Sequence, residues 1–180
     1  MNTIATERLL LRPFTESDAP PVVALAGDRR IADTMISIPH PYTIEHYNQW
    51  LAAIYSAKER DRSYHFAITE KNDNKLVGSV EIRDIDSEHR QAELSLWIGT
   101  GYWNRGYASE AANAVIEFAF NRLGLNRIYA HHMMRNPACE SLFKKIGMQR
   151  EGILRQRVIK WNVPEDVGLY AILKDDIKGR

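Results

Sequence analysis

Alternating hydrophobic and polar positions predict a series of short strands along the 180-residue chain. Residues 9–14 form an apolar run that is interrupted by a proline, and residues 64–68 alternate between apolar and polar side chains. The same reasoning predicts further strands at 76–82, 93–98, 127–132, 158–161 and 167–173, with a turn at 162–165 between the last two.

Apolar positions three and four residues apart predict four helices between these strands. The most regular one has a wide apolar face, and glycines follow the last two and favour their ends. The helices are expected to begin after the cap-type residues 15–18, after Thr43, at residue 108 and at residue 136, and to end near residues 26, 58, 122 and 146.

The predicted order of elements is β-α-α-β-β-β-α-β-α-β-β. Strands in series, followed by a strand-helix-strand crossover, favour an α/β (α+β) protein with a mixed sheet and helices on both faces. The chain shows no repeat, low-complexity tract or linker, and its length is typical of one domain. We therefore expect a single domain over residues 1–180.

Composition narrows the class of protein. The formal charge of +1 provides no broad basic surface, so we expect neither nucleic-acid binding nor binding to an anionic membrane. The only cysteine is Cys139, and the N-terminal residues lack the basic and apolar regions of a signal peptide. No apolar run is long enough to cross a bilayer. The expected location is the cytoplasm.

The segment 97–111 contains the most informative pattern, because a strand leads through a short loop directly into the strongest helix. The first amides of a helix lack intrahelical partners and carry partial positive charge, so this place suits an anion such as a diphosphate. Gly106 lets an anion approach the backbone, and Arg105 can add a positive charge. A glycine that only makes the turn before the helix explains the local pattern equally well.

Residues 102–111 resemble the acyl-CoA pyrophosphate loop of the GNAT superfamily, and most closely that of the ribosomal-protein N-terminal acetyltransferases. The resemblance extends from residues 6–12 to 166–170 and includes 136–139, 143–148 and 151–155. The broader superfamily often has Gln or Arg where Trp103 stands. The sequence also departs from many relatives at Phe143, where they have Tyr, and from the close subgroup at Cys139, where Ser is usual.

This resemblance implies a mostly antiparallel sheet that is splayed in the middle to hold acetyl-CoA as co-substrate. The strand before the loop is expected to bind the pantetheine arm through its backbone, and the loop to bind the phosphates. Asn136 matches a cofactor-binding asparagine, although capping of the next helix explains it as well. The expected cofactor-binding residues are Trp97, Ile98, Asn104, Arg105, Gly106, Tyr107, Ala108, Ser109 and Asn136.

Glu93 matches the position of a general base in the resembled family, and partial burial is expected to raise its pKa toward a useful value. A solvated or salt-bridged strand glutamate is the alternative. Since Phe143 has no proton to give, Cys139 is the candidate donor to the leaving thiolate, or else a small buried apolar residue. The resemblance favours direct transfer over an acyl-cysteine intermediate.

No metal site is expected, because the adjacent His131 and His132 point to opposite faces of a strand and cannot easily share an ion. The resemblance implies an N-acetyltransferase for a primary amine, with the α-amine of a protein N-terminus, of a ribosomal protein by analogy, as the expected acceptor. An α-amine loses its proton more readily than a lysine. A polyamine or antibiotic acetyltransferase and a non-catalytic acyl-CoA sensor are the alternatives, and a homodimer stays open.

Overall fold

The computed structural model describes residues 3–59 and 62–177, and its strands form one mixed sheet in the order β1-β2-β3-β4-β5-β6-β8-β7. All neighbouring strands are antiparallel except β5 and β6, which are parallel. This mostly antiparallel sheet confirms the predicted fold class. The strands are β1 (Ile4–Ala5), β2 (Leu9–Arg12), β3 (Tyr64–Glu70), β4 (Leu76–Asp86), β5 (Gln91–Ile98), β6 (Arg127–Met133), β7 (Gln149–Lys160) and β8 (Val163–Leu173).

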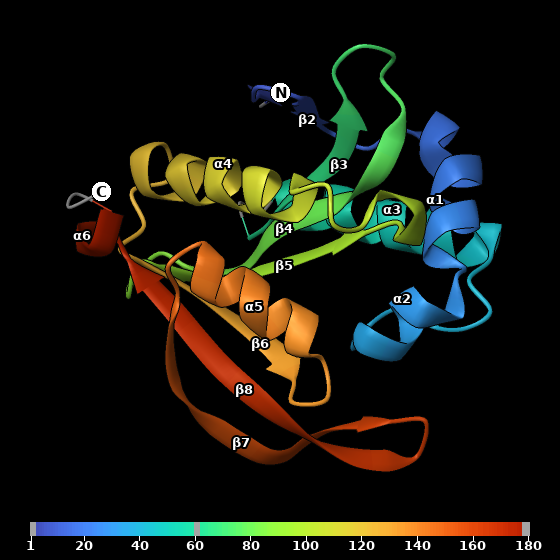
Figure 1. Cartoon of the computed structure of the whole chain (residues 1–180). Helices are drawn as coiled ribbons and strands as arrows, with labels where there is room; N and C mark the ends of the chain where they lie inside the picture. The colour runs from blue at the N-terminus through green and yellow to red at the C-terminus, as the bar shows by residue number, and fades with distance from the viewer. Residues whose placement is uncertain (1–2, 60–61, 178–180) are drawn as a thin grey trace.

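Helices cover both faces of the sheet, and Figure 1 shows α4 and α5 on the side opposite α3. One apolar cluster packs α4 and α5 against the sheet, and a second cluster packs α1 to α3 against the other face. Within the described part of the chain, no helix combines the length and the apolar character needed to cross a membrane. The helices are α1 (Ala19–Ala26), α2 (Arg29–Thr34), α3 (Ile44–Glu59), α4 (Tyr107–Asn121), α5 (Pro137–Lys145) and α6 (Lys174–Ile177), with short 3₁₀ turns at Glu16–Asp18 and Thr100–Tyr102.

The sheet opens between its two parallel strands. Pairing of β5 with β6 covers only three residue pairs, and the last of them joins Glu93 to Tyr129. Beyond this pair the described residues of β5 stay bonded to β4, while those of β6 stay bonded to β8. One edge of β5 from Leu94 onward therefore faces an opening, which is the splay that the GNAT resemblance implied.

Five features differ from the elements predicted from the sequence. The strand β1 and the helices α2 and α6 were not predicted, because segments of two to six residues are too short to show a hydrophobic period. The strand β7 begins at residue 149 rather than 158, since it is an edge strand with mostly exposed side chains and register shifts. The turn consists of Trp161 and Asn162, both with positive φ, and not of residues 162–165.

The packing of α4 on the sheet generates a stability prediction. Ile116 is almost fully buried in the cluster beneath α4, whereas its neighbour Glu117 is exposed. We expect Ile116→Ala to lower the free energy of unfolding by about 2–5 kcal/mol, through lost apolar contacts and a residual cavity. Glu117→Ala, the matched control, should change it by less than about 0.5 kcal/mol. Urea denaturation measures both, and equal effects would contradict this packing.

Candidate active site

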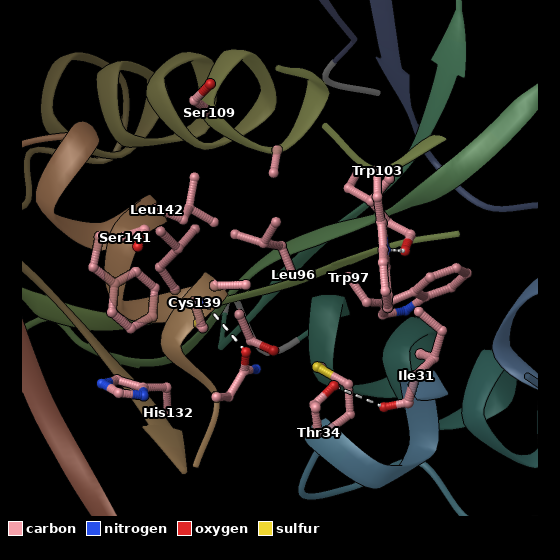
Figure 2. A pocket seen from close by; sticks show the side chains of 18 of the residues that line it. Ile31, Thr34, Leu96, Trp97, Trp103, Ser109, His132, Cys139, Ser141 and Leu142 are labelled. Atoms are coloured by element: carbon pink, nitrogen blue, oxygen red, sulfur yellow. Dashed lines mark hydrogen bonds between the residues drawn. The ribbon is translucent and has the colours of Figure 1, made fainter. Parts of the chain in front are cut away.

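A cavity of about 530 Å³ fills the opening between β5 and β6. Figure 2 shows Cys139, Ser141 and Leu142 of α5 on one side of it, and Trp97 and Trp103 on the other. The structure thus gathers residues that lie more than thirty positions apart in the chain. The predicted site residues that line the cavity are Glu93, Trp97, Ile98, Asn104, Gly106, Tyr107, Ala108, Ser109, Asn136 and Cys139.

The loop before α4 presents backbone amides to this cavity. Gly106 is the residue before the helix and has φ +80°, and Asn104 also has a left-handed φ of +61°. The amide of Glu110 donates to the carbonyl of Gly106, so the amides of residues 107–109 precede the first bond of the helix. Consecutive amides at such a helix start favour an anion.

Two predicted loop residues have other contacts. The guanidinium of Arg105 lies over the ring of Tyr102, 5.3 Å from its centroid, and Arg105 is not among the residues that line the cavity. That the positive charge of Arg105 helps to bind the phosphates stays a prediction. The hydroxyl of Ser109 donates to the carbonyl of Gly106 at 2.9 Å, which strengthens the first turn of α4.

An N-terminal clamp, which the sequence did not reveal, holds this loop in place. Thr6 and the backbone amide of Arg8 donate to Oε1 of Glu110 at 2.6 and 2.8 Å, and Nε of Arg8 donates to Oε2 at 2.7 Å. Nη1 of Arg8 also donates to the carbonyl of Arg105. The clamp neutralises the only acidic side chain in the first turn of α4, which would otherwise repel an anion.

The end of β5 supplies backbone and aromatic groups. The indole Nε1 of Trp103 donates to the carbonyl of Ile98 at 2.6 Å, so this carbonyl is engaged by the protein. The side chain of Trp97 packs instead on the apolar cluster of α1 to α3. The open edge that follows Leu94 is where an extended chain can form backbone hydrogen bonds.

Glu93 lies at the point where the sheet opens, and its carboxylate belongs to a buried ion-pair network. Nε of Arg83 donates to Oε2 at 3.2 Å, and Nδ1 of His131 lies 3.0 Å from Oε1. Burial alone raises the pKa of this carboxyl, but the hydrogen bonds from His131 and Arg83 outweigh burial and lower it below its ordinary value. The expectation of a raised pKa for Glu93 was therefore wrong, because both partners come from other strands.

The two adjacent histidines have different surroundings, as strand geometry predicts. His131 faces Glu93, whereas His132 is buried and packs against Phe143 and Tyr170. Nδ1 of His132 donates to the backbone carbonyl of Met133 at 2.9 Å. The described residues contain no cluster of three or more His, Cys, Asp or Glu side chains that could bind a metal ion.

The start of α5 places Cys139 beside the cavity. The side-chain oxygen of Asn136 accepts a hydrogen bond from the amide of Cys139 at 3.2 Å, so Asn136 caps the helix and also lines the cavity. Burial raises the pKa of the Cys139 thiol to about 12. Burial therefore favours the protonated thiol, which is a weak hydrogen-bond donor.

A second cavity of about 400 Å³ adjoins the first on the α1–α3 side of the sheet. Ser95, Leu96 and Trp97 of β5 contribute to the walls of both cavities. Among the described residues that line the second cavity, Glu81 is the only Asp, Glu, Lys or Arg. Tyr42 and Trp50 contribute aromatic rings to the wall of the same cavity. Two ligands can therefore meet at β5 from opposite sides.

Comparison with known proteins accounts for this arrangement. Residues 8–149 match the family model described as an acetyltransferase (GNAT) domain. An uncharacterized N-acetyltransferase, YoaA of Bacillus subtilis, is 31% identical over 95% of this chain and 96% of its own length. A spermidine N(1)-acetyltransferase of Vibrio cholerae is 26% identical over 96% of this chain and 97% of its own.

The solved structure of a ribosomal L7/L12 α-N-protein acetyltransferase in complex with coenzyme A has the same fold. Its TM-score is 0.89 at 17% identity, and the match covers 97% of this chain and 99% of that one. Together, the family model and the Bacillus relative show that this chain belongs to the GNAT acetyltransferase family and is an N-acetyltransferase.

Proposed function

We propose that this N-acetyltransferase transfers the acetyl group of acetyl-CoA directly to the α-amine of a protein N-terminus, with residues 1–180 acting as one domain. The observation that carries the proposal is the cavity in the open part of the sheet. At one end it has the free amides at the start of α4, and at the other it has the ionised groups around Glu93. An anionic cofactor and a cationic acceptor are thereby drawn to different ends.

The residues around the first cavity fit coenzyme A. Its diphosphate matches the amides of Gly106, Tyr107, Ala108 and Ser109, with Asn104 and Arg105 beside them. Its pantetheine arm carries amides that can extend the sheet at the open edge near Trp97 and Ile98. The acetylated sulfur then lies near Asn136 and Cys139, which line the same cavity.

An α-amine is the acceptor best suited to this site, because its ordinary pKa of about 7.7–8.0 leaves a useful fraction neutral. The acceptor of the ribosomal relative supports a ribosomal protein by analogy. One observation favours polyamines as a second candidate: Glu81 is the acidic residue that lines the second cavity, where its carboxylate, already 2.7 Å from His65 and 3.7 Å from Arg83, can add an ammonium group to these partners. The Vibrio relative named for spermidine supports the same alternative.

Leaving-group stabilisation is assigned to Cys139. Its thiol remains protonated because burial raises its pKa to about 12, so it can donate a hydrogen bond to the departing thiolate. The same property argues against an acyl-cysteine intermediate, which requires a thiolate nucleophile. This supports direct transfer between the two bound substrates.

Phosphate binding at α4 predicts a sharp effect of Gly106→Asp. The substitution places a negative charge and a side chain at φ +80° against the diphosphate, and a Cβ there would lie 3.2 Å from Nη2 of Arg8. We expect the affinity for coenzyme A in calorimetry to fall at least about tenfold, equivalent to about 1.4 kcal/mol. Gly124→Asp is the control, with similar φ (+68°) and the same charge at the other end of α4, and should retain affinity. Equal losses in both variants would contradict the loop assignment.

The donor role of Cys139 predicts that Cys139→Ser keeps most of the turnover through its hydroxyl, whereas Cys139→Ala lowers kcat about ten- to hundredfold. The alanine variant loses the hydrogen bond to the thiolate, and such a bond to a charged group contributes about 1.5–3 kcal/mol. Release of free coenzyme A measures the turnover. Full turnover of the alanine variant would remove Cys139 from the mechanism.

The acceptor proposal predicts selective use of free N-termini. In an assay with acetyl-CoA, peptides with ribosomal N-terminal sequences should be acetylated, and the same peptides with blocked α-amines should not. Spermidine and spermine complete the panel, and mass spectrometry locates the acetyl group. Turnover with polyamines alone would select the second candidate, and acetylation of lysine in the blocked peptides would contradict both.

A further inference from the structure

We propose that His131 is the group that removes the proton from the attacking amine, and that Glu93 positions His131 rather than acting as the base itself. The inference deepens the proposed function at the same site. It rests on transfer to an amine and not on which amine is used. From the sequence alone, His131 is noted only because it cannot easily share a metal ion with His132.

The strand register brings the two residues together where the sheet opens. Glu93 on β5 is opposite Tyr129 on β6 in the last parallel pair. His131 follows two positions later on β6, so its side chain lies on the same face as that of Tyr129 but beyond the last paired residues. Both Glu93 and His131 line the first cavity, which also contains Asn136 and Cys139.

The partners of Glu93 leave it poorly suited to take a proton. Its Oε2 accepts from Nε of Arg83, and its Oε1 lies 3.1 Å from Nη2 of Arg83 and 3.0 Å from Nδ1 of His131. These contacts favour the ionised carboxylate and lower its pKa. A carboxylate held in this way is a strong hydrogen-bond acceptor for an imidazole and a weak base toward an amine.

The same contacts fix the tautomer of His131. An ionised carboxylate only accepts hydrogen bonds, so Nδ1 of His131 must carry the hydrogen in the bond to Glu93. In the neutral ring, Nε2 is then left with its lone pair. Within the described residues no hydrogen bond engages Nε2, and the ring lines the cavity. A carboxylate that orients an imidazole in this manner also stabilises the imidazolium that forms.

The charged and titratable groups of the network that contains His131 come from four strands. Arg83 on β4 and Glu93 on β5 form one ion pair, and Arg83 also lies 3.7 Å from Glu81. On β6 itself, the ring of Tyr129 lies at 79° to that of His131, with centroids 5.6 Å apart. On β3, Nδ1 of His65 lies 2.7 Å from Oε2 of Glu81, so an imidazole and a guanidinium both face this second carboxylate.

The transfer step balances with these groups. The neutral amine nitrogen attacks the thioester carbonyl carbon and forms the C–N bond, and Nε2 of His131 accepts the proton that the nitrogen loses. The C–S bond then breaks, and the thiolate, hydrogen-bonded by Cys139, receives a proton through solvent as the imidazolium is deprotonated. The products are an N-acetylated amine and free coenzyme A, and no further reactant is needed.

His131→Gln tests the proposal by a pH–rate profile with the best amine of the acceptor panel. We expect kcat to fall about hundredfold, the usual scale of general-base catalysis, and the acidic limb of the profile to disappear. Affinity for coenzyme A in calorimetry should stay within about twofold, which shows that the variant is folded. His89→Gln, an identical change at an exposed turn residue, should leave rate and profile unchanged.

Two further variants separate His131 from Glu93. Added imidazole should increase the activity of His131→Ala at least about tenfold, because a free base can occupy the space that the side chain left. Glu93→Gln should lower kcat and move the acidic limb to lower pH, since loss of the carboxylate charge makes protonation of the ring less favourable. A merely structural role for His131 predicts neither the rescue nor the altered profile.

The outcomes that overturn the inference are distinct from failure of the proposed acceptor. If His131→Gln keeps kcat within about threefold and retains the acidic limb, His131 is not the base. If Glu93→Gln abolishes the acidic limb while His131→Gln keeps it, Glu93 is the base. If only polyamines are acetylated, the N-terminal acceptor fails, and the same variants are measured with spermidine.

Discussion

The loss of pairing between β5 and β6 after Glu93 and Tyr129 is the constraint on which the site depends. Parallel strands that stayed bonded to the end would close the sheet and leave no space for a ligand. Here β5 remains with β4 and β6 remains with β8, so each strand keeps one partner while the two diverge. Backbone groups on the open edge of β5 become available without destabilising either half of the sheet.

One continuous segment links the two ends of the site. The strand β5 begins beside the ion-pair network of Glu93 and leads through the loop at Asn104 and Gly106 into α4. Because a strand extends by about 3.3 Å per residue, the distance between Glu93 and the start of α4 is set by the backbone rather than by flexible side chains. The N-terminal clamp of Thr6 and Arg8 on Glu110 holds the start of α4 in place at the other end of this segment.

Local patterns were sufficient to predict α4, which begins at Tyr107 against an expected start at residue 108, because its apolar face has a regular period. Phosphate binding at the loop before this helix was inferred from the same helix start and stays a prediction. The lowered pKa of Glu93 could not be predicted, since Arg83 and His131 come from other strands and only the register places them within hydrogen-bond distance. For His131, strand alternation excluded a metal ion shared with His132, but it could not identify Glu93 as the hydrogen-bond partner. The parallel register of β5 and β6 would have been needed for that.

The charge cluster of Glu81, Arg83 and Glu93 lies on one face of the sheet and borders both cavities. Glu81 lines the second cavity and Glu93 the first, and the single guanidinium of Arg83 contacts both carboxylates. Nδ1 of His65 lies 2.7 Å from Oε2 of Glu81, so an imidazole also contributes to the charge balance of the cluster. Each carboxylate thus has one imidazole neighbour, His65 for Glu81 and His131 for Glu93, with Arg83 between them. Only the register of β3, β4, β5 and β6 brings these groups together, because they lie far apart in the sequence.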